Sequence, residues 1–171
     1  MANTYIAIAT VTVGSGGAAN IEFTSIPGTY TDLVISVSGR TNNGFNQDWL
    51  LIQFNDVTTG YTSRILTGTG SVVSSNTIIG DRAATMVGAT ATSNTFSNAA
   101  IYIPNYAGST NKSFSSDSVN EINATGTEAI TNLIAGLWSN TAAITKIKLT
   151  PYSAGTIQQY STATLYGIKK D

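Results

Sequence analysis

The residues of this chain best suited to acid–base chemistry are two pairs of carboxylates, Asp117 with Glu121 and Asp48 with Asp56. Two carboxylates on a β-sandwich can cleave a glycosidic bond when their separation leaves room for the sugar and a water molecule. On an extended strand, however, Asp117 and Glu121 lie about 13 Å apart, because each residue adds about 3.3 Å. That distance exceeds the separation of an inverting pair. We therefore interpret these acids as solvated surface groups.

Other catalytic and metal chemistry lacks its usual residues. The chain contains no His and no Cys, so Ser and Thr have no common activating base, and disulfides and thiolate metal sites are excluded. Oxygen ligands for calcium could come from residues 42–48 or from Asn55 and Asp56. These sequences are also ordinary turns, and no D-x-D-x-D run accompanies them. The sequence predicts a protein that is not an enzyme, with no catalytic residue, no cofactor and no metal.

A polar loop at residues 40–47 is the main candidate contact surface. Phe45 is its one aromatic residue, and amide side chains flank it. Loops at the ends of sandwiches often carry recognition, and an aromatic beside amides suits a sugar or a protein. Tyr106, after the turn at 104–105, is a second aromatic of this kind. The alternative is that both rings fold back onto the core. The candidate contact residues are Arg40, Asn42, Asn43, Phe45, Gln47 and Tyr106.

Alternation of apolar and polar residues predicts the strands that must carry these groups. The pattern is clearest in residues 33–39, 97–103, 145–149 and 162–168. A period of two residues is typical of strands with one buried face, and turn residues separate the segments. We expect one domain over residues 1–171, an all-β antiparallel sandwich of jelly-roll type with about eight to ten strands.

Four segments carry more specific expectations. Residues 49–54 are nearly all apolar, which predicts a central strand covered on both faces. Residues 113–121 have no richly apolar face and predict an exposed strand, and residues 68–80 predict a long loop or a weak edge strand. Residues 129–138 form a second apolar run. Its Ile, Thr and Gly favour a strand over a short helix at 128–133.

The phase of each strand predicts which side chains form the core. A chain of this length can bury one complete core without disulfides or a metal. Trp49 and Trp138 are assigned to that core because both lie within apolar strands. The aliphatic residues assigned to it are Leu33, Ile35, Val37, Leu51, Ile101, Ile103, Leu133, Leu137, Ile147, Leu149 and Leu165.

Charge argues against several classes of partner. With 8 basic and 9 acidic residues among 171, the formal net charge is −1. Nucleic acid is bound through basic patches, so we expect no nucleic-acid partner. The N-terminal residues lack the pattern of a secretory signal and no apolar run is long enough to span a membrane, so we expect no membrane partner. A near-neutral surface rich in Ser, Thr and Asn permits association, which favours a homo-oligomer.

Five stretches together carry a family resemblance. They are residues 30–34 (YTDLV), 51–55 (LIQFN), 101–106 (IYIPNY), 137–144 (LWSNTAAI) and 161–168 (STATLYGI). In these stretches the chain resembles the small virion structural proteins of tailed bacteriophages, especially those that infect marine bacteria and cyanobacteria. The resemblance extends over most of the chain. Its motifs mark strands and turns and include no catalytic site.

The resemblance implies a structural part of a phage particle, located in the virion. We expect a capsid decoration (knob or cement) protein on the outer surface of the head, with the major capsid protein or other virion proteins as partners. Such a protein would add interface between capsid subunits, and weak contacts per copy suffice because many copies act together. The alternative is a tail-fibre or receptor-binding module that recognises a host surface glycan through loops such as residues 40–47.

Overall fold

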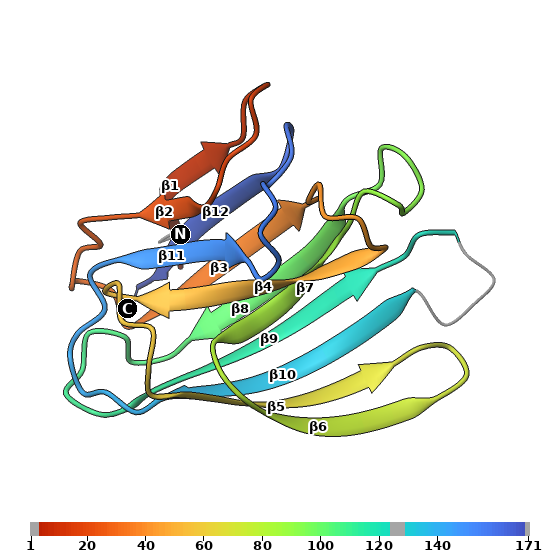
Figure 1. The fold of residues 1–171 in the computed structure, drawn as a ribbon. Coiled ribbons are helices and arrows are strands. Elements are labelled where there is room, and N and C mark those ends of the chain that lie inside the picture. Colours follow the sequence, from red (N-terminus) through yellow and green to blue (C-terminus); the bar gives the residue numbers. More distant parts are fainter. Residues whose placement is uncertain (1–3, 124–128, 170–171) are drawn as a thin grey trace.

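Twelve antiparallel strands in two sheets make up the part of the chain that the computed structural model describes, residues 4–123 and 129–169 (Figure 1). The strands are β1 (Tyr5–Thr12), β2 (Ile21–Phe23), β3 (Asp32–Gly39), β4 (Gln47–Phe54), β5 (Tyr61–Gly68), β6 (Val73–Ile79), β7 (Arg82–Val87), β8 (Ser97–Ile103), β9 (Lys112–Asn120), β10 (Ile130–Trp138), β11 (Ile147–Pro151) and β12 (Thr162–Ile168). Within these residues no helix is long and apolar enough to cross a membrane.

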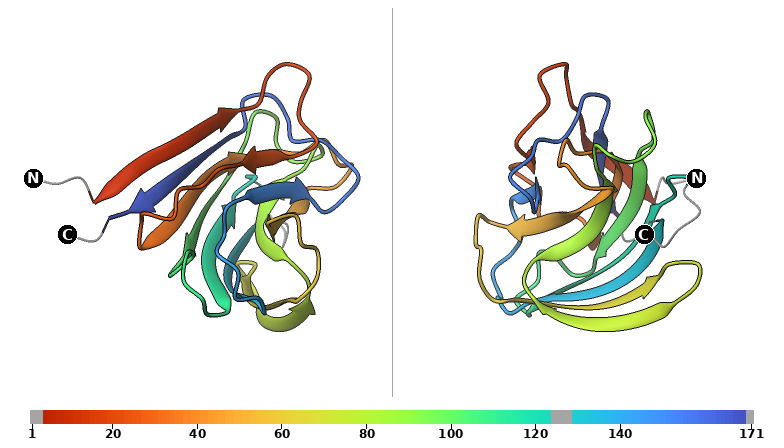
Figure 2. Two further views of the ribbon diagram at one scale, coloured as in Figure 1. Left: turned by 90° about the vertical axis from the view of Figure 1, so that its left-hand side faces the viewer. Right: turned by 45° about the vertical axis from the view of Figure 1, so that its right-hand side comes forward.

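The strands form a large sheet, with the order β1-β12-β3-β8-β9-β10-β5-β6, and a small sheet, with the order β2-β11-β4-β7. The small sheet covers only part of the large one, and β1 and β12 project beyond it (Figure 2). The prediction of an all-β antiparallel sandwich is confirmed. Jelly-roll topology stays a prediction. The twelve strands exceed the expected eight to ten, in part because residues 68–80 contain the edge strand β6.

The core lies between the sheets and follows the predicted alternation on β3. Leu33, Ile35 and Val37 point inward and are at most 5% exposed, while the residues between them lie on the outer face. Burying an aliphatic side chain contributes about 1.5–3 kcal/mol, which fixes the register of this strand. The core prediction is confirmed for Leu33, Ile35, Val37, Ile101, Ile103, Ile147, Leu149, Leu165 and Trp138.

Two corrections concern β4, which is not covered on both faces. Leu50, Ile52 and Phe54 are buried, whereas Leu51 is half-buried on the opposite face. Trp49 is half-buried too and packs at the margin of the core. The assignment of Leu51 and Trp49 to the buried core is therefore wrong. An uninterrupted apolar run hides the phase of a strand, so the sequence could not tell the two faces of β4 apart.

The predicted phase of β10 is also wrong for two leucines. Residues 129–138 form a strand as expected, but Leu133 is 56% exposed and Leu137 is 38% exposed. The inner face carries Ile134 and Trp138 instead. Gly136 lies on that inner face directly under the Phe114 ring, where an added Cβ would come within 2.0 Å of a ring carbon. Trp138 and this close approach set the phase of the strand.

Aromatic rings fill one end of the core. The Trp138 ring stacks on Tyr61 with 5.9 Å between centroids, and it lies 5.5 Å from Phe54. Phe54 also meets Phe114 edge to face at 6.1 Å. The Phe54 N–H donates a 2.7 Å hydrogen bond to the Tyr61 hydroxyl, so this polar group has a partner within the cluster.

The prediction that residues 113–121 form an exposed strand is wrong, because β9 lies in the middle of the large sheet. Its five inner residues are all buried, and all but Phe114 are polar. The Ser116 hydroxyl donates to the backbone carbonyl of Ala83, and the Ser118 hydroxyl accepts from the backbone N–H of Thr85 at 3.3 Å. Both partners belong to β7, whose outer edge would otherwise carry unpaired backbone groups. The serines of β9 thus cap an edge strand of the other sheet.

Candidate functional site

The outer face of the large sheet has small side chains at its centre. Strand register places Tyr102, Ser115 and Ala135 side by side across β8, β9 and β10. Asp117 and Leu133 face each other in the next row of the same face. Cross-strand partners point to the same side of a sheet, so these rows form one surface. The Ser and Ala in its middle leave a depression.

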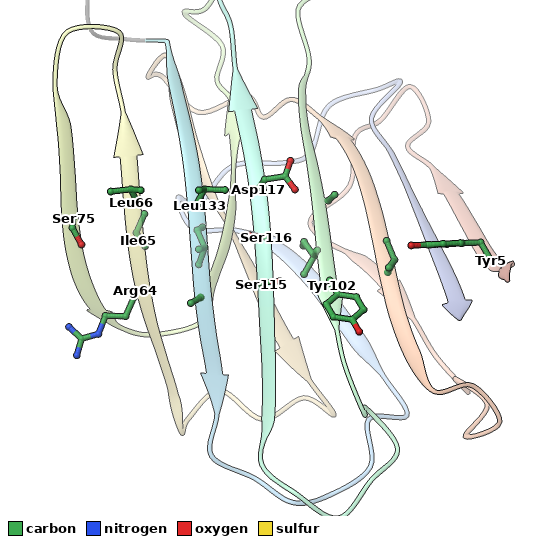
Figure 3. Close-up of a pocket in the computed structure, with 15 residues that line it drawn as sticks. Tyr5, Arg64, Ile65, Leu66, Ser75, Tyr102, Ser115, Ser116, Asp117 and Leu133 are labelled. Atoms are coloured by element: carbon green, nitrogen blue, oxygen red, sulfur yellow. The ribbon is translucent and has the colours of Figure 1, made fainter. Parts of the chain in front are cut away.

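A groove of about 630 Å³ follows this depression across the sheet (Figure 3). Tyr5 and Tyr102 lie at one side and are 56% and 39% exposed. Leu66 and Leu133 lie at the other side and are 44% and 56% exposed. Single exposed apolar residues are common on proteins, but a group of them around one groove is typical of a binding surface.

Hydrogen bonds and ring contacts hold the aromatic side of the groove in place. The Tyr102 hydroxyl donates a 2.9 Å hydrogen bond to the Asp32 carboxylate. This bond raises the pKa of Tyr102 above its ordinary value. The Tyr5 ring meets Tyr166 edge to face with 6.3 Å between centroids. Because these contacts already restrict the two tyrosine side chains, less conformational entropy is lost when a ligand binds.

The groove offers the chemistry of recognition. Among the described residues that line it, Asp117 is the one carboxylate and Arg64 the one guanidinium. The other lining residues are aliphatic, aromatic or hydroxyl-bearing. Two-carboxylate glycoside cleavage needs a second acid beside the first, and the described lining does not supply one. In residues 4–123 and 129–169, no group of three or more His, Cys, Asp or Glu could hold a metal ion.

The carboxylate pairs named from the sequence are not assembled into a site. Asp117 lines the groove, whereas Glu121 lies beyond the end of β9 and accepts a 2.7 Å hydrogen bond from the Asn123 N–H. Asp48 lies near the start of β4 and Asp56 follows its end. Asp48 is buried, and this burial raises its pKa, against hydrogen bonds from Ser153 that lower it. The pKa of Asp56 is instead held low by its hydrogen bond with Lys146.

Ion pairs mark the outer face of the small sheet as a solvated surface. The Lys146 ammonium lies 3.1 Å from the Glu22 carboxylate and 2.9 Å from that of Asp56. Lys148 lies 3.4 Å from the same Asp56 oxygen. Exposed pairs of this kind add little stability, but they keep a surface hydrated. This face therefore differs from the outer face of the large sheet in its charge.

In the loop predicted as a contact surface, residues 40–47, most polar side chains form hydrogen bonds within the protein. The Arg40 guanidinium donates to four backbone carbonyls of residues 89–95. Asn42 accepts a 2.7 Å hydrogen bond from the Thr156 N–H, and Asn43 is buried and donates to the Gln47 carbonyl at 3.1 Å. Phe45 is 69% exposed, and the Gln47 side chain is exposed as well. Contact by these residues stays a prediction.

The contact prediction for Tyr106 is wrong because its side chain is fully buried. Its hydroxyl donates to the backbone carbonyl of Pro27, and its ring belongs to the main core. The turn at 104–105 directs the ring inward, which is the alternative that the sequence left open.

The groove was not found from the sequence, although two signals for it exist there. In β8 the apolar residues Ala99, Ile101 and Ile103 alternate along the buried face. Tyr102 lies between two of them on the solvent-exposed face. In β10, Leu133 and Leu137 lie out of phase with Trp138. Several large apolar residues on the polar phase of neighbouring strands together are a sign of a functional surface.

Comparison of the chain with protein-family models, with curated proteins and with solved structures gives no match.

Proposed function

We propose that this protein is a non-enzymatic structural component of a bacteriophage virion, a decoration protein that docks on the outer surface of the head. The observation that carries this proposal is the outer face of the large sheet, a broad groove with apolar sides on a protein of nearly zero net charge. The resemblance of the chain to small virion proteins of tailed phages points the same way.

The docking partner would be the major capsid protein or another protein of the shell. Leu66, Leu133 and Leu137 are exposed on neighbouring strands of one face, so a partner that covers them gains about 25 cal/mol per Å² of buried apolar surface. Ser115 and the hydroxyl groups beside it can hydrogen-bond without the entropy cost of ordering long side chains. The energy per copy stays small, and many copies together stabilise the shell.

The experiment that tests this proposal compares phage particles with and without the protein. Particles that lack a decoration protein assemble and adsorb to host cells, yet release DNA at a lower temperature or on chelation. The readouts are DNA release during a temperature ramp and the fraction of particles adsorbed to cells. Normal heat stability together with loss of adsorption would contradict the decoration role.

Glycan recognition by a receptor-binding module is the second candidate, and the aromatic side of the groove favours it. Tyr5 and Tyr102 are exposed at one side of the groove, and Asp117 and Arg64 add polar groups that could fix a sugar. Under this alternative the glycan would bind on the sheet face, whereas the sequence suggested residues 40–47. Under this alternative, Tyr102→Ala reduces adsorption of the phage while heat stability is unchanged. Under the decoration role, Tyr102→Ala leaves adsorption unchanged.

A further inference from the structure

The edge strand β6 is exposed, regular and uncharged. Six of its seven residues are exposed, including Val73 at 73% and Ile79 at 90%. Its sequence, VSSNTII, contains neither a charged residue nor Pro. Its ladder with β5 runs without a register shift from Val73 to Ile79. A long edge strand with these properties is a template for pairing with another strand.

The other three sheet edges each carry a feature that hinders pairing. β1 is interrupted by an irregularity in its register between Ala7 and Ala9. β2 is three residues long and has Glu22 at its centre. β7 is capped by the hydroxyls of Ser116 and Ser118. Because proteins commonly protect their edges in these ways, the unprotected state of β6 indicates that its edge is used.

The hydrogen bonds between β6 and β5 show which backbone groups of β6 are left to pair with another strand. The N–H of Gly80 donates to the Tyr61 carbonyl, and the N–H of Thr69 donates to the Val72 carbonyl. In an antiparallel ladder the bonded positions alternate, so residues 72, 74, 76, 78 and 80 direct their backbone groups at β5. The N–H and C=O groups of residues 73, 75, 77 and 79 therefore point out of the sheet.

We propose that β6 pairs with β6 of a second copy of this chain, antiparallel and about a two-fold axis at Asn76. This register places Val73 opposite Ile79 of the second copy and Ser75 opposite Thr77. It is the centred register in which every outward-facing backbone group from residue 73 to residue 79 finds a partner. The proposal does not depend on the decoration role.

In this register the side chains of the two β6 strands complement each other. On the outer face, the exposed Val73 and Ile79 cover each other at both ends, and the hydroxyls of Ser75 and Thr77 meet between them. A two-fold contact requires this kind of self-complementary patch. No like charges meet, because the strand has none. Pairing joins the two large sheets into one continuous sheet across the axis (Figure 1).

Cysteine cross-linking tests the register. Asn76 opposes its own copy at a non-hydrogen-bonded position, where Cα atoms lie about 4.5 Å apart, a separation that a disulfide can span. Since the chain has no Cys, oxidised Asn76→Cys protein should run as a covalent dimer on non-reducing gels. Ser74→Cys is the matched control on the same face of the same strand. Its two copies would lie about 13 Å apart, so it should stay monomeric on the gel.

Charge variants test the pairing without cysteine. Ser75→Glu/Thr77→Glu places like charges opposite each other across the axis, whereas Ser75→Lys/Thr77→Glu places opposite charges there. Both variants keep Thr77→Glu next to Arg64, the cross-strand partner of residue 77 within one copy. In analytical ultracentrifugation, the native protein and the Lys/Glu variant should sediment as dimers and the Glu/Glu variant as a monomer.

Circular dichroism and thermal melting of each variant confirm that the sandwich is folded before its mass is interpreted. A native protein that is monomeric at all concentrations tested would overturn the proposal. A native dimer that survives Ser75→Glu/Thr77→Glu unchanged, or cross-linking of Ser74→Cys as efficient as that of Asn76→Cys, would overturn it as well. None of these outcomes bears on heat stability or adsorption of the phage, so the two proposals fail separately.

Discussion

The two faces of the large sheet carry similar residue types, but those on the inner face are buried and those on the outer face are exposed. On the inner face of β10, Ile134 and Trp138 are buried in the core, while on the outer face Leu133 and Leu137 are in solvent. On β9, inner Ser116 caps an edge of the opposite sheet, whereas its outer neighbours line the groove. The inner face is explained by folding. The outer leucines lie outside the core, and the proposed docking partner would cover them.

Loss of Trp138 should give the largest change in stability. Trp138→Ala removes the ring that stacks on Tyr61 and packs on Phe54, and leaves a cavity at that end of the core. We expect a decrease of about 3–5 kcal/mol in the free energy of unfolding, measured by chemical denaturation. Tyr102→Ala, an aromatic truncation on the outer face, is the control. A loss for Tyr102→Ala as large as that for Trp138→Ala would remove the distinction between the faces.

Neighbouring residues of β10 allow a closer comparison. Ile134→Ala should lower the free energy of unfolding by about 2–5 kcal/mol because the side chain is buried. Leu133→Ala, one residue away and 56% exposed, should change it by less than about 1 kcal/mol. Denaturant titration of both variants gives the two values. The reverse order would mean that the strand has the opposite phase.

A comparison of β10 with β3 shows which strand faces can be predicted from the sequence. In β3, Ser36 and Ser38 alternate with apolar residues and only Val34 is apolar on the outer phase, so the inner face of that strand could be predicted. In β10, Leu133, Ile134, Leu137 and Trp138 are all apolar. The phase then depends on tertiary contacts, here the approach of Gly136 to the Phe114 ring.

The groove and the buried face of β9 were missed for related reasons. Ser116 and Ser118 resemble surface residues in the sequence, because their partners on β7 are far away along the chain. The groove depends on register across β8, β9 and β10, which no local pattern encodes. Burial of Tyr106 likewise depends on Pro27, a distant residue.

The capping role of β9 predicts an intermediate effect. Ser118→Ala removes the acceptor for the Thr85 N–H and leaves this buried donor on β7 without its side-chain partner. We expect a loss of about 1–3 kcal/mol in the free energy of unfolding. Ser115→Ala, three residues away on the outer face, should be nearly neutral. Thermal and chemical denaturation measure both variants. Equal losses for Ser118→Ala and Ser115→Ala would contradict the capping role.

Asp48 should give the smallest change, visible in the pH dependence of stability. Its folded-state pKa is raised above the ordinary value of 3.8 by burial. The folded state therefore binds the proton more tightly than the unfolded state, and stability falls as pH rises through the interval between these two pKa values. Asp48→Asn should remove this decline, so the melting temperature of the variant relative to the native protein should increase from pH 4 to pH 7. A constant difference across this range would contradict the assignment.

Binding of the purified protein to phage particles that lack it tests whether the outer face of the large sheet docks on the particle. Co-sedimentation with such particles should be lost for Leu133→Lys/Leu137→Lys, which places charge on the outer face of the large sheet. Lys148→Ala, on the outer face of the small sheet, should co-sediment like the native protein. Circular dichroism confirms that both variants are folded, and we then expect loss of binding for the first and retention for the second. Native-like binding by Leu133→Lys/Leu137→Lys would contradict it.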